Sequence, residues 1–180
     1  MKILKAIANL YIYIIRGTPM LVQILIIYFG LGQMLRPTGF RWLNIGGTFT
    51  AGTVALSLNA GAYMAEIVRG GIEAVDKGQI EAARSLGLTY GKTMKKIVLP
   101  QALRTMLPSI INQFIISIKD TSLLSVIGLT ELTNVGKTIA ATQSAHMMVI
   151  YCFMACYYLF ICTVLAQVSK VVEKRLSYGK

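Results

Sequence analysis

Residues 79–108, QIEAARSLGLTYGKTMKKIVLPQALRTMLP, form the one strongly charged island between long uncharged segments, and they decide the fold. Residues 79–86 are mostly good helix formers and predict a short helix. Gly87 follows directly and is expected to end that helix in the left-handed conformation. Thr89 is expected to cap a second helix. The stretch therefore predicts two short helices joined by a sharp bend, which we call the elbow (residues 77–97).

The first helix of the elbow is expected to carry a small, nearly flat apolar face. Three side chains recur at helical spacing on it: Ala82, Ala83 and Leu86. Glu81 and Arg84 flank the face with opposite charges. A face of this kind is suited to docking in a groove of another protein.

A longer pattern that includes the elbow resembles a known family. Its specified positions are Glu81-Ala82-Ala83, Gly87, Ile97 and Leu99-Pro100. At each of them the chain resembles the EAA loop of ABC importer permeases, where this loop is a coupling helix in a cleft of a cytoplasmic ATPase subunit. The resemblance implies these ATPase-coupling residues: Gln79, Glu81, Ala82, Ala83, Leu86 and Gly87. The alternative is an ordinary amphipathic elbow between two membrane helices.

The composition is that of an integral membrane protein. Of the 180 residues, 55% are hydrophobic and 14% are charged, and the mean hydropathy is +0.63. Soluble domains average about a quarter charged residues, so the composition excludes a soluble domain. The net charge of +11 is spread along the flanks of apolar segments. This indicates contact with membrane lipid and argues against a nucleic-acid partner.

Apolar segments divide the chain into a single all-α transmembrane domain, residues 1–180, with about four spans. Residues 1–18 carry apolar side chains on one side and lysines on the other, which predicts an interfacial amphipathic helix. Long apolar runs predict the spans, at residues 19–35, 49–67, 98–118 and 147–168. Residues 119–146 are too charged and interrupted to span, so we expect an external or re-entrant segment there.

Polar residues inside the predicted spans are the candidate substrate pathway. Asn59, Tyr63 and Glu66 lie at positions i, i+4 and i+7, so they form one stripe along the second span. Gln113 lies on the third span, which prolines interrupt as in helices that line cavities. Arg69, three residues after Glu66, is the expected ion-pair partner of that carboxylate. For Asn59 and Tyr63, contact with a neighbouring helix explains the stripe equally well.

The distribution of Lys and Arg predicts the orientation in the membrane. Residues 1–18 contain three, residues 69–96 contain six, and the two remaining loops contain two each. The tail contains four: Lys170, Lys174, Arg175 and Lys180. By the positive-inside rule, the elbow and both ends of the chain are expected to be cytoplasmic.

No nucleotide site and no catalytic site are predicted. Two Gly-Lys-Thr runs begin at Gly91 and Gly136, but Leu86 and Glu131 stand where a phosphate loop needs its first glycine. His146 has no Ser or Cys nucleophile near it in a catalytic pattern. We therefore expect a chain that is not an enzyme and binds no cofactor, with ATP used by a partner subunit.

No metal site is predicted either. The three cysteines, Cys152, Cys156 and Cys162, fall within one apolar segment. Because no second ligand pair or nearby histidine completes a zinc set, we expect buried free thiols.

Further blocks resemble the polar amino acid branch of these permeases. They are Arg16-Gly17-Thr18-Pro19, Ala62-Tyr63-Met64-Ala65-Glu66, Arg69-Gly70-Gly71-Ile72, Gly78-Gln79 and Lys119-Asp120-Thr121-Ser122-Leu123. The resemblance implies uptake of a polar amino acid across the bacterial cytoplasmic membrane. It also implies three protein partners, which are an ATPase subunit, a second permease subunit, identical or different, and an external amino-acid-binding protein. Family members usually have one more span before the amphipathic segment, and this chain is expected to lack it.

Three functions stay open at this point. The leading hypothesis is a subunit of an ATP-driven importer whose elbow moves with the ATPase. The alternative is an ATP-independent channel or carrier in which the elbow is only structural, and a membrane assembly factor is the third. Co-purification of an ATPase in mild detergent separates the first from the second, and substrate-dependent flux excludes the third.

Overall fold

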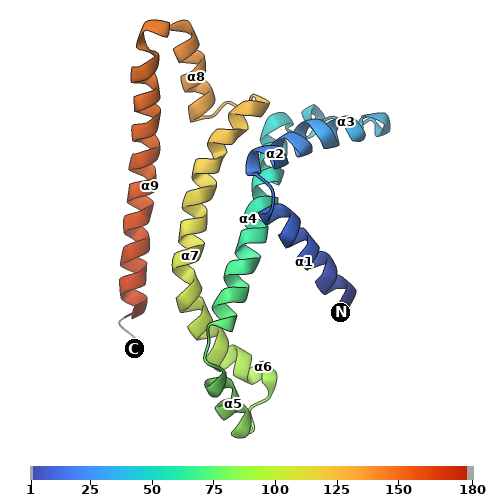
Figure 1. Ribbon diagram of the computed structural model, residues 1–180, viewed down its shortest axis with the longest axis vertical. Coiled ribbons are helices and arrows are strands. Elements are labelled where there is room, and N and C mark those ends of the chain that lie inside the picture. Colours follow the sequence, from blue (N-terminus) through green and yellow to red (C-terminus); the bar gives the residue numbers. More distant parts are fainter. Residues whose placement is uncertain (1, 178–180) are drawn as a thin grey trace.

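Three long helices run side by side and form the body of the protein: α4 (Gly47–Glu73), α7 (Leu99–Asp120) and α9 (Met147–Ser177) (Figure 1). The computed structural model describes residues 2–177, together with the side chains of residues 2–174. Every regular element among residues 2–177 is a helix. The predicted all-α fold class is therefore confirmed.

The N-terminal part of the chain is a bent pair of helices beside α4. Helix α1 (Lys2–Arg16) packs against α4, and the chain then turns by 110° into the helical run Met20–Met34. This run consists of α2 (Met20–Leu25), a π-helical stretch (Ile26–Leu31) and α3 (Gly32–Met34). In Figure 1 it lies across the direction of the long helices.

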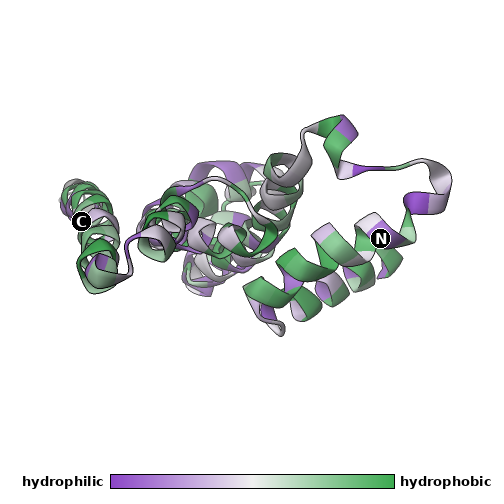
Figure 2. Ribbon diagram, turned by 90° about the horizontal axis from the view of Figure 1, so that it is seen from above, coloured by the Kyte–Doolittle hydropathy of each residue, from purple (hydrophilic) through white to green (hydrophobic). Residues whose placement is uncertain are grey.

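Two apolar clusters hold the helices together. The upper cluster in Figure 1 joins α2 and α4 to the 3₁₀ segment Thr121–Ile127, through Ile24, Ala55, Leu124 and Ile127. The lower cluster joins the end of α4 to α7 through Val75, Val98, Ala102 and Met106. Many of the remaining apolar side chains are exposed, including a large number on α9. Figure 2 colours the ribbon by hydropathy and shows how much of the chain is apolar. An apolar exterior of this kind is what a lipid-facing helix requires.

By length and apolar composition, two helical runs of the described residues are suited to crossing a membrane: Tyr90–Ile127 and Ser144–Lys174. Helix α1 and the run Met20–Met34 add a third only if the bent pair counts as one span. The predicted span 49–67 falls inside α4, which has 27 residues but is not one of these runs. The boundaries of the four spans therefore stay predictions.

Residues 119–146 and the elbow occupy opposite ends of the molecule (Figure 1). The former segment contains the 3₁₀ segment Thr121–Ile127, helix α8 (Leu132–Thr142) and a short 3₁₀ turn (Ser144–His146). Its placement outside or within the membrane stays a prediction. Of the predicted basic tail, Lys180 lies outside the described residues, as does the side chain of Arg175.

Candidate functional site

The first helix of the elbow, α5 (Lys77–Ser85), has a well-defined beginning and end. The carboxylate of Asp76 accepts a hydrogen bond from the backbone N–H of Gly78 at 2.6 Å, which caps its first turn. At the other end Gly87 adopts a φ of +80°. There the N–H of Leu88 donates to the carbonyl of Ala83 at 3.2 Å, and the N–H of Gly87 to that of Arg84 at 3.0 Å. The left-handed helix end predicted at Gly87 is confirmed, and the two hydrogen bonds give it the form of a Schellman motif.

The second helix of the elbow is shorter and continues directly into α7. Helix α6 (Tyr90–Thr93) leads into a π-helical stretch (Met94–Val98) and then α7. Thr89 precedes α6 with extended backbone, but its side chain accepts no capping hydrogen bond, so the predicted cap is wrong. Thr89 is exposed, so water can satisfy the first N–H groups of α6 in its place.

The predicted docking face on α5 is divided by the fold. Leu86 is 84% exposed and Ala82 and Glu81 are exposed beside it, whereas Ala83 is only 3% exposed. Ala83 lies three residues after Ile80, which packs against the lower cluster, so both are on the inner side of the helix. The prediction that Ala82, Ala83 and Leu86 share one outward face is therefore corrected, because Ala83 belongs to the inner side.

A side-chain hydrogen bond ties the elbow to α7. The Nε2 group of Gln101 donates to Oε1 of Gln79 at 2.6 Å and to the carbonyl of Ile97 at 3.1 Å. Gln79, implied by the resemblance as a coupling residue, thus holds α5 against the first turn of α7. The role of Gln101 was not predicted, because a single glutamine in a helical segment gives no indication in the sequence of which residue it will bond.

Asn59, the first predicted pathway residue, is buried at a contact between helices. Its Nδ2 donates to Oε1 of Gln23 at 2.9 Å. Gln23 in turn donates to the carbonyl of Ile15 at 2.7 Å, to the hydroxyl of Thr18 at 2.9 Å and to the Thr18 carbonyl at 3.0 Å. Gln23 therefore bridges α4 to the turn between α1 and α2. The hydrogen bond agrees with the alternative that Asn59 contacts a neighbouring helix. Gln23 was not among the residues predicted from the sequence.

Replacing Gln23 by leucine should lower the free energy of unfolding by about 1–3 kcal/mol, because the amide of Asn59 would stay buried without a partner. Thermal unfolding in detergent measures the effect. Gln33→Leu is the matched control, since Gln33 is exposed on the same helical run. Equal unfolding midpoints for the two variants would contradict the bridging role of Gln23.

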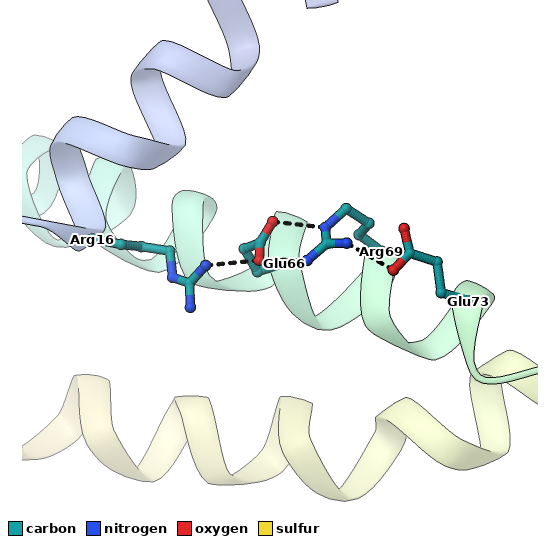
Figure 3. Close-up of polar contacts among 4 residues, drawn as sticks. All are labelled: Arg16, Glu66, Arg69 and Glu73. Atoms are coloured by element: carbon teal, nitrogen blue, oxygen red, sulfur yellow. Dashed lines mark hydrogen bonds and ion pairs between the residues drawn. The ribbon is translucent and has the colours of Figure 1, made fainter.

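Glu66 sits in a chain of ion pairs that Figure 3 shows along α4. Its carboxylate accepts two hydrogen bonds from Arg69, both at 2.9 Å, and pairs with Arg16 of α1 at 2.7 Å. Arg69 also pairs with Glu73 at 2.7 Å. Hydrogen bonds to Glu66 and then to Glu73 raise the pKa of the Arg69 guanidinium above its usual value. The predicted pairing of Glu66 with Arg69 is confirmed, and Arg16 is an additional partner that joins α1 to α4.

The four predicted pathway residues do not line one common cavity. Tyr63 and Gln113 line an open cavity of about 630 Å³ among α4, α7 and α9, where Gln113 is 4% exposed. Other polar side chains that line it are Ser109, Asn112, Ser169, Lys170 and Glu173. Glu66 lines a different cavity of about 400 Å³, between α1 and α4. Asn59 lines neither cavity, because its buried side chain is hydrogen-bonded to Gln23.

Among residues 2–177, no group of three or more His, Cys, Asp or Glu residues is placed to hold a metal ion. The three cysteines of α9 are free thiols, as expected. The expectation that they are buried is wrong: Cys152 and Cys156 are exposed and Cys162 is partly exposed. The reason is that α9 packs on α7 and α8 along one side only and turns its other side outward.

Comparison with known proteins places this chain among transport proteins. Residues 1–178 match the family described as "Binding-protein-dependent transport system inner membrane component". The glutamine transport system permease protein GlnP of Escherichia coli (strain K12) is 44% identical over 170 residues, covering 94% of this chain and 74% of that protein. The arginine transport system permease protein ArtQ of Bacillus subtilis (strain 168) is 40% identical with the same coverage. The L-cystine transport system permease protein TcyB of Bacillus subtilis (strain 168) is 41% identical, covering 96% and 70%.

Solved structures of ABC transporters resemble the fold. The crystal structure of an amino acid ABC transporter with histidines matches with a TM-score of 0.87 and 39% identity, covering 97% of this chain and 78% of that one. The inward-facing MetNI methionine ABC transporter matches with a TM-score of 0.67 and 18% identity, covering 95% and 74%. At this identity the second likeness concerns the fold alone.

Proposed function

The chain belongs to the binding-protein-dependent transport system inner membrane components and is a polar amino acid ABC permease. We propose how transport through it is coupled to ATP hydrolysis. It moves a polar amino acid into the cytoplasm when a separate ATPase subunit, docked on the elbow, binds and hydrolyses ATP. The chain itself binds no nucleotide. Its other partners are a second permease subunit, an external amino-acid-binding protein and membrane lipid.

The exposed outer side of α5 is the observation that carries this proposal. Glu81 and Ala82 of α5 and Leu86 at its C-terminal end are exposed. Helix α5 lies at one end of the molecule, beyond the long helices (Figure 1). ATP can bias transport only if the ATPase binds the elbow differently in the two states of the permease. Because the lower cluster and the Gln79–Gln101 hydrogen bond attach the elbow to α4 and α7, a displaced elbow would move both helices.

The cavity among α4, α7 and α9 is the proposed part of the substrate pathway. Tyr63 and Gln113 contribute a hydroxyl and an amide, which are groups suited to a polar amino acid. Asn59 and Glu66 are assigned a supporting role, since their side chains join α4 to the α1–α2 turn and to α1. The elbow and the C-terminus are assigned to the cytoplasmic side of the bacterial inner membrane, in agreement with the positive-inside rule.

Disulfide or short-linker crosslinking tests the docking of the ATPase. Ala82→Cys is expected to capture the ATPase in transport-active vesicles, because Ala82 is exposed on the outer side of α5. Ala83→Cys is the matched control: it is the adjacent residue in the same helix but is 3% exposed, so its thiol should remain uncaptured.

Vesicles that transport the amino acid while neither cysteine captures an ATPase would overturn the proposal. They would favour an ATP-independent channel or carrier in its place. Capture through Ala83→Cys but not Ala82→Cys would instead place the partner on the opposite side of α5.

A further inference from the structure

Tyr63 connects helix α1 to the proposed pathway cavity among α4, α7 and α9. Its side chain lines that cavity together with Gln113. The guanidinium carbon of Arg16, at the end of α1, lies over the ring of Tyr63 at 5.6 Å from the ring centroid. Arg16 itself lines the other cavity, between α1 and α4. The contact between Arg16 and Tyr63 therefore links the walls of two separate cavities.

The contact between Arg16 and Tyr63 has the geometry of a cation–π interaction. A guanidinium within about 6 Å of a ring centroid is attracted by the negative face of the aromatic ring. The tyrosine side chain has few rotatable bonds, each with preferred angles, so a cation held over one face favours one orientation of the ring. Arg16 therefore restricts how Tyr63 presents its ring and hydroxyl at the wall of the pathway cavity.

Arg16 is held in place by α4. Its Nη1 pairs with Oε2 of Glu66 at 2.7 Å (Figure 3). Tyr63 and Glu66 are three residues apart and lie on the same side of α4, so one guanidinium can contact both. The hydroxyl of Tyr11 donates a hydrogen bond to the carbonyl of Leu58, which attaches α1 to α4 at a second point. These contacts fix the position of the guanidinium relative to the ring of Tyr63.

We propose that Arg16 is a positioning residue for the substrate pathway. It holds Tyr63 in the orientation in which Tyr63 contacts the transported amino acid, and Glu66 acts one step further away by holding Arg16. This inference rests on the proposed function, since it needs the cavity that Tyr63 and Gln113 line to receive the amino acid. It gives α1 a part in substrate binding, although no residue of α1 lines that cavity among the described residues.

A purely structural role for Arg16 leads to a different expectation. Arg16 would then only attach α1 to α4, and its loss would lower stability without changing the affinity for the amino acid. Glu66 accepts two hydrogen bonds from Arg69, both at 2.9 Å, so its carboxylate keeps a partner when Arg16 is removed. Variants of Arg16 should therefore fold, and their affinity can be measured.

Equilibrium binding of a radiolabelled amino acid to the detergent-solubilised complex of permease and ATPase, without the external binding protein, tests the inference. The probes are L-glutamine and L-arginine at up to millimolar concentration. Arg16→Gln should raise the concentration for half-saturation about three- to tenfold, because the ring of Tyr63 loses its cation. Arg16→Lys keeps a positive charge that the ring attracts, so it should recover part of the lost affinity.

Arg69→Gln is the matched control. Arg69 is the other cation paired with Glu66, and it also pairs with Glu73. Its replacement removes ion pairs from α4 but leaves Arg16 over the ring of Tyr63, so the half-saturation concentration should stay unchanged. Thermal unfolding of each variant in detergent separates a change in stability from a change in affinity.

A double variant shows whether Arg16 acts through Tyr63. Tyr63→Leu removes the ring and should weaken binding by itself. Adding Arg16→Gln to Tyr63→Leu should weaken binding no further, because the cation then has no ring to position. Effects of two changes that act through one contact do not add, whereas those of independent changes do.

Unchanged half-saturation in Arg16→Gln would overturn the inference. So would an equal loss of affinity in Arg69→Gln, no recovery in Arg16→Lys, or additive effects in the double variant. If the unaltered complex bound neither amino acid, the inference would fail together with the assignment of the cavity to the pathway. Docking of the ATPase on the elbow is judged separately, by the crosslinks at Ala82, so it can fail or stand independently of these binding measurements.

Discussion

Gly87→Val should reduce ATP-dependent uptake about tenfold or more while ATP hydrolysis by the assembled complex continues, because a left-handed position costs a residue with a Cβ atom roughly 1–2 kcal/mol. The φ of Gly87 is +80°, and a branched side chain tolerates this conformation least. A Cβ atom at this position would meet nothing within 4 Å, so the effect would come from the backbone alone. The turn would reorganise, and α5 would no longer present its outer side at the same angle.

Gly91→Ala is the matched control for this experiment. Gly91 is in the same elbow and also has open space around it, but it lies within α6 and its φ is negative. Alanine there should leave uptake unchanged, and Gly87→Ala should fall between the two. Uptake per ATP hydrolysed is measured in proteoliposomes containing the ATPase and the external binding protein. If Gly87→Val transports as well as the Gly91→Ala variant, the left-handed turn has no part in coupling.

Glu81→Lys should lower retention of the ATPase on the purified permease by about tenfold or more, because reversing a charge within a docked interface typically costs several kcal/mol. Glu81 is exposed on the outer side of α5 and forms no ion pair among the described residues. Its carboxylate is therefore free to meet a partner. Retention is measured as the ratio of ATPase to permease after affinity purification in mild detergent.

Two further variants separate a specific contact from a general effect of charge. Glu81→Gln removes the charge and should weaken retention less than the reversal. Gln143→Lys adds a lysine at the exposed residue that follows α8, and α8 lies at the opposite end of the molecule from the elbow (Figure 1), so retention should stay unchanged. Undiminished retention in Glu81→Lys, or an equal loss in Gln143→Lys, would remove Glu81 from the proposed interface.

Local signals predicted the elbow well. A glycine after a run of good helix formers is sufficient to predict a helix end, because the left-handed conformation is accessible to glycine at little cost. The predicted cap at Thr89 was wrong because residue type is also only a local signal. It does not determine whether the threonine side chain or water accepts hydrogen bonds from the free N–H groups at the start of α6. The pairing of Glu66 with Arg69 was also predictable, because residues three apart on a helix are neighbours.

By itself the sequence determined the all-α class, the elbow with its turn at Gly87, and the likeness to amino acid permeases. Only the tertiary structure decided which side of α5 is buried, how Gln23 bridges α4 to the α1–α2 turn, and which polar residues line a common cavity. The bond between Asn59 and Gln23 joins residues 36 apart in the chain, and that between Gln101 and Gln79 joins residues 22 apart. Helical periodicity relates residues only within a few turns. Contacts over such separations depend on how whole helices pack, which the pattern of one sequence does not specify.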